Sequence, residues 1–379
     1  MIFGNIFIPG CIIHGWMYYP GVNKRMLEEK GKVEGLYVLI LLMIVAVTFT
    51  VVGHSIASPG YSQNQVEDYL KNASENEVRD ILSVVPEDIL SSQVEKKYPL
   101  LVEDDLGRKV IIEEKPENII SLSPSVTETL FALGLENRII GVSEACDYPS
   151  RVVGMREKGE IKTVAPYAGA VKTEKVLNLN PSLVVGAAGT PMDSIEEMEK
   201  VGITFVGVEG ENIPTVKEGI ELIGQVTGTS ETAQKITENI QHKIDEIAEI
   251  TENIARENKP TVYYEVWELW TVGPGTFLHE IIVRAGGINI AENSEAKYPK
   301  VKEETIVGKN PDFFITGKDA RTTKKSVKED YPGITAVEEN QIVLLDKEMR
   351  DVFSRPGPRL PMAVQELTKI LYPELEDSF

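Results

Sequence analysis

Histidine and cysteine are scarce in this chain of 379 residues, which holds four histidines and two cysteines. Cys11 and Cys146 form no C-x-x-C pair and no cysteine–histidine group, so the sequence offers neither a disulfide framework nor the spacing of a zinc site. A histidine-rich site for a bare transition metal cannot be assembled from so few ligands. We therefore expect no resident metal and no resident cofactor.

Motifs of the common enzyme classes are also missing. The sequence has no G-x-x-x-x-G-K-[ST] phosphate loop, no G-x-S-x-G elbow and no H-E-x-x-H, and Gly273-Pro-Gly275 lacks the third glycine of a dinucleotide turn. No Ser-His or Cys-His couple is evident, and we expect His279 to be structural or on the surface. Cys146 is expected to be a small buried packing residue. The sequence therefore predicts a protein that is not an enzyme.

Positive charge is in the minority, with 39 basic residues against 59 acidic ones and a formal net charge of −20. Binding of nucleic-acid phosphates needs a basic face, and no cluster of lysine and arginine interleaved with aromatics occurs. A nucleic-acid partner is therefore excluded. The length suffices for two domains, each with its own core.

Three arginines nevertheless gather in one short stretch of this acidic chain. RDVFSRPGPRL places Arg350, Arg355 and Arg359 around Pro356-Gly357-Pro358. A Pro-Gly-Pro run cannot continue a helix or a central strand, so the stretch is a shaped loop that carries cations. The arginines either lie solvated at the start of a following helix, LPMAVQELTKIL, or contact a ligand.

One long apolar run, GLYVLILLMIVAVTFTVVG, lies near the N-terminus and carries no charge. It is about long enough to cross a ~30 Å hydrocarbon layer, and we assign residues 36–53 as a transmembrane anchor or as a signal segment cleaved near Ser55-Ile56-Ala57. Basic residues precede the run and acidic residues follow it. This charge pattern places residues 1–35 in the cytoplasm and the large C-terminal part on the extracytoplasmic face of the membrane. Translation from Met26 would give a conventional signal segment.

Residues 54–105 are polar and include an N-x-[ST] site at Asn72, which is typical of a spacer or stalk. The pattern changes from Leu106 onward. Short β-branched runs, namely VIIEE, IISL, IIGV, LVVG and ITFVGV, alternate with amphipathic stretches, and a second set follows with TVYYEVW, LWTVG, FFITG and IVLL. This alternation predicts an α/β fold with mostly parallel sheets.

One long amphipathic helix is predicted over residues 230–257, between the two sets of strands. Isoleucines recur there every three to four residues, at Ile236, Ile240, Ile244, Ile247, Ile250 and Ile254. At ~1.5 Å per residue the helix would span roughly 40 Å, about the width of a domain. We expect it to join an N-terminal lobe, residues 106–229, to a C-terminal lobe, residues 258–379. An ordinary surface helix within one large domain is the alternative.

An internal repeat supports two lobes. VKTEKVLNLNPSLVVG, beginning at Val171, aligns without a gap with VKEETIVGKNPDFFIT, which begins 130 residues later at Val301. In both copies a predicted short helix is followed by Asn-Pro and an apolar strand. Glu174 and Glu304 occupy matched places in the first helical turn, where the helix dipole alone is a sufficient reason for glutamate.

Several aromatic residues fall at strand ends or in the loops just after them. They are Tyr148, Tyr167, Trp267, Trp270 and Tyr298. Open α/β sheets hold ligands at this edge. Each aromatic alone is more often a packing residue, but together they could line a cleft for a flat, bulky ligand.

The segment IISLSPSVTETLFALGLENRIIGVSEACDYP resembles the opening of the cobalamin and iron-siderophore binding proteins that serve ABC importers. Further motifs follow in the same order: VKTEKVLNLNPSLVVG, SIEEMEKVGITFVGVE, LHEIIVRAGGINIAE, YPKVKEETIVGKNPDFFITG and SRPGPRLPMAVQELTKILYPE. The resemblance covers residues 110–375. It implies two Rossmann-like lobes joined by one long helix, with the ligand held between them. It also implies a monomeric solute-binding protein whose partners are a permease and an ATPase, and whose ligand is a corrinoid, a ferric siderophore or haem.

The resemblance further implies roles for single residues. Asp351 and Arg355 have the spacing of an aspartate–arginine pair that contacts the rim of the ligand, and Tyr298 stands where the family has a cleft aromatic. Tyr167 matches another cleft aromatic only after a shift of one residue, and Ala145 replaces a third. The expected ligand-binding set is Tyr148, Tyr167, Trp267, Tyr298, Asp351 and Arg355, and the expected permease-docking pair is Glu174 and Glu304.

The ligand and the function class have alternatives. An Asp-Arg pair suits the amides of a corrinoid, whereas a cluster of arginines suits an anionic ferric siderophore. An extracellular sensor or adhesion module could use the same fold, and an enzyme acting on a tetrapyrrole would need acid and base residues that the sequence does not offer.

Overall fold

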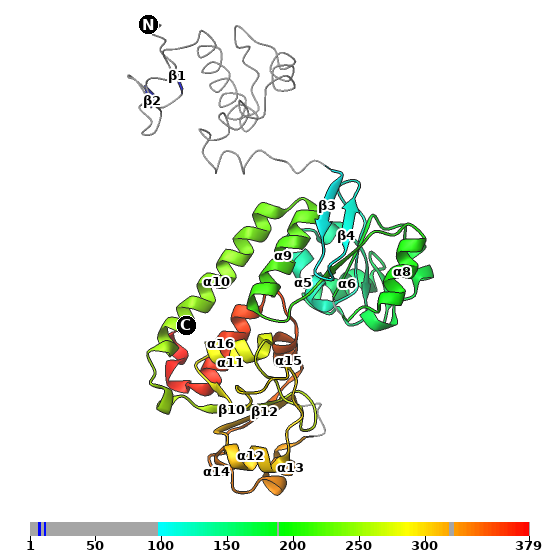
Figure 1. Ribbon diagram of the computed structural model, residues 1–379. Coiled ribbons are helices and arrows are strands. Elements are labelled where there is room, and N and C mark those ends of the chain that lie inside the picture. The colour runs from blue at the N-terminus through cyan, green and yellow to red at the C-terminus, as the bar shows by residue number, and fades with distance from the viewer. Residues whose placement is uncertain (1–6, 9–10, 13–97, 188, 318–321, 379) are drawn as a thin grey trace, which may run out of the picture. The chain divides into compact units, whose positions relative to one another are not determined.

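The computed structural model describes residues 7–8, 11–12, 98–187, 189–317 and 322–378 (Figure 1). The chain divides into two compact units, residues 1–95 and 96–379. In the first unit the described residues form an antiparallel pair of short strands, β1 Phe7–Ile8 and β2 Cys11–Ile12. The expected membrane segment at residues 36–53 and the spacer up to residue 97 lie outside the described residues. No helix within the described ranges is both long and apolar enough to cross a membrane.

A five-stranded sheet forms the centre of the N-terminal lobe, and all its neighbouring strands are parallel. In spatial order the strands are β7 Lys162–Ala165, β6 Ile139–Ser143, β5 Ile119–Ser121, β8 Leu183–Ala187 and β9 Phe205–Val208. The connections carry α5 Pro124–Ala132, α6 Ser150–Glu157, α7 Thr173–Leu177, α8 Met192–Lys200 and α9 Ile213–Thr227, with 3-10 turns η1 Glu136–Arg138 and η2 Ala168–Ala170.

The β-branched runs of this sheet are buried on both faces, which is why they read as continuous apolar stretches. Successive side chains of a strand point to opposite faces. Ile119, Leu183 and Val185 accordingly belong to one hydrophobic cluster, while Ile120 and Val184 belong to another. Helices therefore cover both faces of the sheet.

An antiparallel hairpin, β3 Leu100–Glu103 and β4 Lys109–Ile112, precedes the sheet. Buried Asp104 holds it to strand β9, because its Oδ2 accepts a hydrogen bond of 2.9 Å from the Gly207 N–H and its carboxylate pairs with Arg108. The Tyr98 hydroxyl also donates to the Val226 carbonyl at 3.0 Å. The predicted boundary between spacer and lobe at residues 105 and 106 was wrong, since residues 98–105 are already part of the folded lobe.

A four-stranded parallel sheet forms the centre of the C-terminal lobe. Its spatial order is β11 Ile288–Asn289, β10 Thr261–Glu265, β12 Phe313–Gly317 and β13 Ile342–Leu345. Its helices are α11 Phe277–Arg284, α12 Glu303–Lys309, α13 Lys324–Asp330, α14 Thr335–Glu338, α15 Lys347–Ser354 and α16 Leu360–Leu371, with 3-10 turns η3 Arg256–Asn258 and η4 Pro373–Ser378. The predicted strand LWTVG forms only isolated bridges, in which Trp270 pairs with Trp267 and with Lys300.

The two copies of the internal repeat have the same local structure. α7 and α12 are each followed by an asparagine in the left-handed region, Asn180 with φ 48° and Asn310 with φ 46°. A proline and then a buried strand come next in both copies. Matched side chains also hold the start of the neighbouring strand: Ser182 Oγ accepts from Asn118 N at 3.0 Å, and Asp312 Oδ2 accepts from Thr261 N at 2.7 Å. The predicted order of short helix, Asn-Pro and strand is confirmed.

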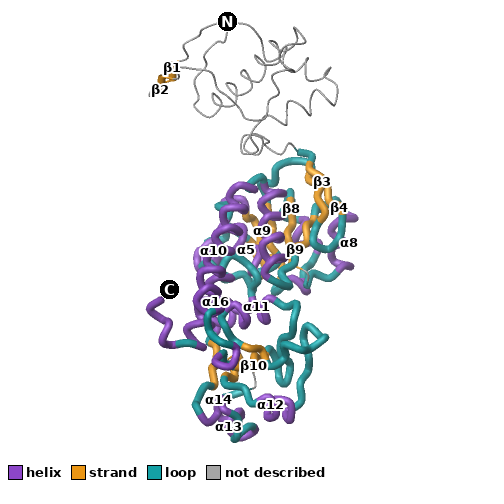
Figure 2. Tube along the Cα trace, turned by 60° about the vertical axis from the view of Figure 1, so that its left-hand side comes forward, coloured by secondary structure: helices purple, strands orange, loops and turns teal. Residues whose placement is uncertain are grey.

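The long helix between the lobes is α10, Ser230–Glu252, with 23 residues. It ends five residues before the predicted end, and η3 then leads the chain into β10. Its length is therefore about 35 Å at ~1.5 Å per residue. Figure 1 shows α10 extending from the five-stranded sheet toward the four-stranded sheet, and Figure 2 shows the two groups of strands at separate levels of the molecule.

One hydrophobic cluster is shared by both lobes and by α10. It contains Ile119 of the first sheet, Val262 and Ile315 of the second, and Ile240 and Ile244 of the long helix. The opposite face of the second sheet has its own cluster around Tyr263 and Phe314. Each fully buried isoleucine contributes about 1.5–3 kcal/mol. The helix is therefore packed into a continuous core and does not act as a free rod between two independent bodies.

Candidate functional site

A cavity of about 260 Å³ lies between the two lobes. Both sheets contribute loops that follow the carboxyl ends of their strands, because all the strands of a parallel sheet end at one edge. Ser125, Glu209 and Glu211 line the cavity from the N-terminal lobe, and Phe277, Tyr298 and Ser354 line it from the C-terminal lobe. The cavity thus lies at the edge where open α/β sheets hold ligands.

The polar wall of this cavity is acidic. Glu209 and Glu211 line it, and none of its described lining residues is arginine or lysine. The Glu209 N–H donates to Asp105 Oδ2 at 2.7 Å. Burial raises the pKa of the Asp105 carboxyl, and the charges of Glu209, Glu218 and Asp104 add to that rise, against the lowering effect of this hydrogen bond. Such a wall favours a neutral or cationic ligand with hydrogen-bond donors over an anion.

The arginine-bearing loop joins α15 to α16 within the C-terminal lobe and contacts the N-terminal lobe. Asp346 caps α15 by accepting from Met349 N at 2.9 Å, and Pro361 lies in the first turn of α16. Between the helices, the loop packs against the N-terminal lobe so closely that a Cβ on Gly210 would lie 2.5 Å from the Cβ of Pro356. Only glycine at position 210 permits this approach.

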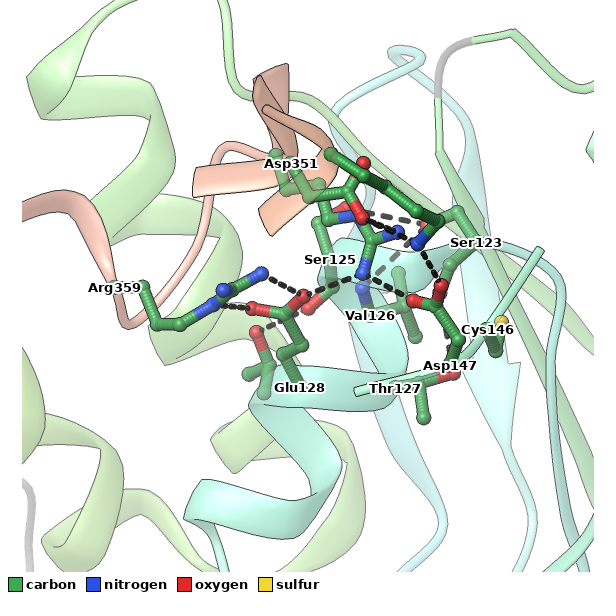
Figure 3. Close-up of polar contacts among 12 residues, drawn as sticks. Ser123, Ser125, Val126, Thr127, Glu128, Cys146, Asp147, Asp351 and Arg359 are labelled. Carbon is green, nitrogen blue, oxygen red and sulfur yellow. Dashed lines mark hydrogen bonds and ion pairs between the residues drawn. The ribbon is translucent and has the colours of Figure 1, made fainter. Parts of the chain in front are cut away.

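Buried Glu128 pairs with two arginines of this loop. Arg359 Nε donates to Glu128 Oε2 and Arg359 Nη2 donates to Oε1, both at 2.7 Å, while Arg355 Nη1 lies 3.2 Å from Oε1. The Glu128 side chain is 2% exposed. It projects from α5, which begins at Pro124 because Ser123 caps the helix. Figure 3 shows Arg359 meeting the carboxylate from the opposite lobe.

Arg355 extends the network to a second pair of carboxylates, those of Asp147 and Asp351. Its Nη1 lies 2.8 Å from Asp147 Oδ1 and its Nη2 lies 2.9 Å from Asp351 Oδ2. Lys347 pairs with the same two aspartates. Asp147 belongs to the N-terminal lobe, so the inter-lobe network consists of Glu128 and Asp147 on one side and Lys347, Asp351, Arg355 and Arg359 on the other.

The contacts of the network shift the pKa values of Asp147 and Arg355. Burial alone would raise the pKa of the Asp147 carboxyl, but hydrogen bonds from Lys347 and Arg355 and their positive charges outweigh it, so the pKa lies below its usual range. Burial alone would lower the pKa of Arg355, but its hydrogen bonds to Asp147 and Glu128 and the charges of Asp351 and Asp147 raise it. Both groups therefore stay charged at neutral pH.

A second set of contacts joins the lobes near the cavity. Glu280 Oε2 of α11 accepts a hydrogen bond of 2.6 Å from Ile213 N, which is an otherwise unpaired donor in the first turn of α9. Lys297 pairs with the cavity residue Glu211. The cavity is therefore bordered by residues that already connect the two lobes.

The structure brings some of the predicted ligand-binding residues together and separates others. Tyr298 lines the cavity and is 47% exposed, and the Tyr148 ring lies 4.0 Å from the Arg359 guanidinium carbon. Asp351 and Arg355 are both engaged in the inter-lobe network. Tyr167 and Trp267 are exposed, at 60% and 61%, and do not line the cavity.

The remaining sequence expectations concern surface and packing residues. Glu174 and Glu304 are exposed in the first turns of α7 and α12, one on each lobe. Cys146 is fully buried, as predicted, with its Sγ 3.2 Å from Ser143 Oγ. His279 is held in the structure by Asn289, whose Nδ2 lies 3.0 Å from His279 Nδ1.

Sequence reasoning missed Glu128, Asp147, Lys347 and Glu280. A glutamate about one turn into an amphipathic helix is normally read as solvent-exposed. The available signal was local: Glu128 lies between Val126, Thr127, Thr129 and Leu130, which are all buried. A charged residue inside such a run must find a partner of opposite charge.

Comparisons with known proteins agree with this architecture. The sequence model of the periplasmic binding protein family matches residues 119–349, which is more than half of the chain. An uncharacterized ABC transporter substrate-binding lipoprotein of Bacillus subtilis, YvrC, is 27% identical over 299 residues, covering 76% of this chain and 91% of the relative. The vitamin B12-binding protein of Vibrio cholerae is 27% identical over 259 residues, covering 67% of this chain and 89% of the relative.

Solved structures give the same fold. The vitamin B12-binding protein BtuF of Vibrio cholerae superposes with a TM-score of 0.56 at 25% identity, covering 68% of this chain and 98% of BtuF. The periplasmic heme-binding protein RhuT of Roseiflexus superposes with a TM-score of 0.60 at 21% identity, covering 68% and 98% of the two chains. At that identity the second likeness concerns the fold alone.

Proposed function

The chain belongs to the periplasmic binding protein family, and from this premise we propose that it is the extracytoplasmic solute receptor of an ABC importer, which captures its ligand between the lobes and delivers it to a permease. The observation that carries the proposal is the cavity at the carboxyl ends of both sheets, to which each lobe contributes side chains. A receptor of this kind performs no covalent chemistry on its ligand.

We infer that the ligand is a corrinoid, and the charges around the cavity support this choice. Glu209 and Glu211 face the cavity, and Lys297 pairs with Glu211, so Glu209 is the lining carboxylate that forms no ion pair with another described residue. Arg355 and Arg359 are already paired with carboxylates. An anionic ferric siderophore or the propionates of haem would meet negative charge there. The amide groups of a corrinoid carry no charge and can donate hydrogen bonds to the glutamates. The B12-binding relatives are consistent with this inference.

A corrinoid is larger than the cavity in its present form. Ligand sites commonly measure about 300–1,000 Å³, and this cavity measures about 260 Å³. We propose that the ligand lies across the mouth of the cavity, with Tyr298 beneath it and with Tyr148, Tyr167 and Trp267 as further aromatic contacts. Asp351 and Arg355 would contact the rim of the ligand, and each would give up a hydrogen bond of the inter-lobe network for a hydrogen bond to the ligand.

Glu174 and Glu304 are proposed to dock the receptor on its permease. Each lobe presents one of them on a short helix, and neither carboxylate forms an ion pair with another described residue. Two exposed charges contribute modestly when taken singly. Attachment at two points to arginines of the partner would raise their combined effect.

A transport assay tests the receptor role. In proteoliposomes that contain the permease and ATPase, Glu174→Arg combined with Glu304→Arg should abolish uptake of cobalamin while calorimetric affinity for cobalamin changes less than about twofold. The matched control is Glu196→Arg with Glu329→Arg, which reverses one exposed glutamate on α8 and one on α13. Normal uptake by the first double variant would refute the docking assignment.

We further propose that residues 36–53 hold the receptor at the extracytoplasmic face of the membrane as an uncleaved anchor, with residues 54–97 as a spacer. The lipoprotein relative is also named as a substrate-binding component of an ABC transporter, which supports attachment near the permease. Intact-mass measurement of the membrane-extracted protein tests this point. A mature chain that begins near residue 58 would show that the segment is a cleaved signal.

A further inference from the structure

An exposed ion pair joins the two walls of the cavity at its rim. The Lys297 ammonium pairs with the Glu211 carboxylate. Glu211 lines the cavity from the N-terminal lobe, and Lys297 immediately precedes Tyr298, which lines it from the C-terminal lobe. The side chains of Lys297 and Glu211 are 50% and 48% exposed. The pair therefore spans the place where the cavity meets solvent.

The backbone of Lys297 is fixed, whereas its side chain can turn. Gly273 N donates to the Lys297 carbonyl at 2.7 Å. A Cβ on Gly273 would lie 2.3 Å from the Ala296 carbonyl oxygen, so only glycine permits this close approach. The Lys297 side chain lies beside Gly275, where a Cβ would be 3.7 Å from Lys297 Cε. Rotation about side-chain bonds is therefore enough to take the ammonium away from Glu211, without movement of either lobe.

Negative charge on the acidic wall holds the Lys297 ammonium in place. The pKa of Lys297 is raised by its hydrogen bond to Glu211, and the charges of Glu211 and Glu209 add to the rise. Burial raises the pKa of the Tyr298 hydroxyl, and the charge of Glu211 adds to that rise while the charge of Lys297 opposes it. The ammonium thus lies beside both cavity carboxylates, at a place that suits a hydrogen-bond donor of a ligand.

The connections between the lobes differ in how readily they break. An exposed ion pair such as Lys297–Glu211 is weak and is screened by salt. The pair of Glu128 with Arg359 is buried, at 2% and 12% exposure, and loss of one partner from such a pair is costly. The hydrogen bond from Ile213 N to Glu280, two residues after Glu211, does not depend on Lys297. A ligand can therefore displace Lys297 while the other connections stay intact.

We propose that the Lys297–Glu211 pair is a strap across the rim of the cavity, which restricts entry until the incoming ligand displaces it. The inference rests on the proposed receptor function and adds how access to the same site is controlled. Before binding, the Lys297 ammonium satisfies Glu211. On binding, a hydrogen-bond donor of the ligand takes its place beside Glu209 and Glu211, and Lys297 turns into solvent.

Association kinetics of the full-length protein with cyanocobalamin test the strap. Lys297→Met should raise the association rate constant about threefold and leave the dissociation rate constant nearly unchanged, because the strap is closed only before binding. Cyanocobalamin carries no net charge, so its encounter with the receptor needs no electrostatic steering. An increase in ionic strength from about 0.02 M to about 0.5 M should speed association of the wild-type protein by a similar factor, but not of Lys297→Met.

Two control variants accompany this measurement. Lys297→Arg retains a cation that can pair with Glu211 and should associate as the wild-type protein does. Lys325→Met removes an exposed ion pair with Glu329 inside α13, and it should likewise leave the association rate and its salt dependence unchanged.

Access to the cavity can also be measured without cobalamin. Val216 lines the cavity and is 2% exposed, and Val216→Cys in a Cys11→Ser background supplies a thiol there, while Cys146 is fully buried. Alkylation by N-phenylmaleimide, located by peptide mass spectrometry, should be about threefold faster when Lys297→Met is added. Addition of Lys325→Met should leave the alkylation rate unchanged.

The outcomes separate the strap from the receptor function. Faster association and faster alkylation with Lys297→Met, together with loss of the salt effect, support the strap. Weaker binding of cyanocobalamin by Lys297→Met would overturn it, because Lys297 would then contact the ligand instead of blocking its entry. Equal rates in the wild-type protein and Lys297→Met would also overturn it and leave the receptor role standing. If no variant binds cyanocobalamin, the corrinoid assignment fails, and the alkylation rates alone decide for or against the strap.

Discussion

Arg359 donates two hydrogen bonds of 2.7 Å to the Glu128 carboxylate. The two residues belong to different lobes and are 231 positions apart in the chain. Both side chains are largely buried, at 12% and 2% exposure. Together with Arg355, Asp147, Asp351 and Lys347, this pair fixes the arginine-bearing loop to the N-terminal lobe. The loop therefore connects the lobes at a second place, in addition to α10.

Removal of the Glu128 charge should destabilise the protein strongly. Glu128→Gln leaves Arg359 and Arg355 buried without a full counter-charge, and loss of one partner from a buried pair costs about 3–5 kcal/mol. Urea denaturation at pH 7 measures the change in the free energy of unfolding. Glu196→Gln, which affects an exposed pair with Lys200, should cost less than about 0.5 kcal/mol. Equal losses in the two variants would contradict the assigned role of Glu128.

Stability should fall in acid as Asp147 takes up a proton. The pKa of Asp147 is lowered in the folded state by Lys347 and Arg355, so the unfolded chain binds more protons in the window just below the ordinary value of about 3.9. The stabilisation by Asp147 is therefore fully present above about pH 4 and is lost as the pH falls through the folded-state pKa. Asp147→Asn should destabilise by about 1 kcal/mol at pH 7.

The pH dependence of that difference is the decisive measurement. Denaturation curves of the wild-type protein and of Asp147→Asn should converge as the pH falls from about 4 through the lowered folded-state pKa of Asp147, because the wild-type carboxyl is neutral below that pKa as well. A difference in stability that stays constant down to the lowest pH would show that Asp147 does not act through its charge.

Substitution by glycine should affect stability differently at Asn180 and at Asn310, the two matched asparagines of the internal repeat. Both have positive φ, where a non-glycine residue costs about 1–2 kcal/mol. Asn180→Gly should therefore change stability by less than about 0.5 kcal/mol, and Asn180→Ala should lower it by about 1 kcal/mol. Asn310→Gly should be destabilising, because the Asn310 side chain makes two hydrogen bonds of 2.8 Å to Thr335. Thermal unfolding of the three variants measures these changes, and equal effects of both glycine variants would refute the distinction.

The lobes should move little when ligand binds. α10 is a continuous helix within a core that both lobes share, and bending it would break backbone hydrogen bonds. Spin labels at Glu157→Cys and Lys324→Cys, in a Cys11→Ser background with buried Cys146 unlabelled, report the distance between lobes. We expect a change below about 2 Å on addition of cobalamin. A shift of many ångströms would show that the shared core opens.

Local sequence patterns predicted the parallel strands, the internal repeat and the long helix, because each depends on the period of apolar residues and on turn residues that lie close together in the chain. The predicted end of the helix was wrong because Ile254 continues the isoleucine spacing, although the helix ends at Glu252. The spacer boundary was wrong because the polar residues Asp104 and Arg108 are used inside the lobe.

Patterns of residues that lie close together in the sequence could not predict the inter-lobe network. Arg355 and Arg359 stood out in the sequence as cations in a shaped loop, but their partners Glu128 and Asp147 lie more than two hundred residues earlier, so no spacing rule connects them. Tyr298 was assigned to the cavity from a resemblance. Trp267 was assigned by its position after a strand, and that position placed it at the correct edge of the sheet but outside the described lining of the cavity.

Calorimetric titration of the full-length protein with cobalamin, a ferric hydroxamate and haem tests the central claim most directly. The acidic cavity wall predicts binding of cobalamin with a Kd below about 1 µM and no measurable binding of haem. Tyr298→Ala should weaken cobalamin binding about tenfold, and Arg355→Ala should weaken it markedly as well. Absence of cobalamin binding beside sub-micromolar affinity for the ferric chelate or for haem would contradict the assignment of a corrinoid ligand.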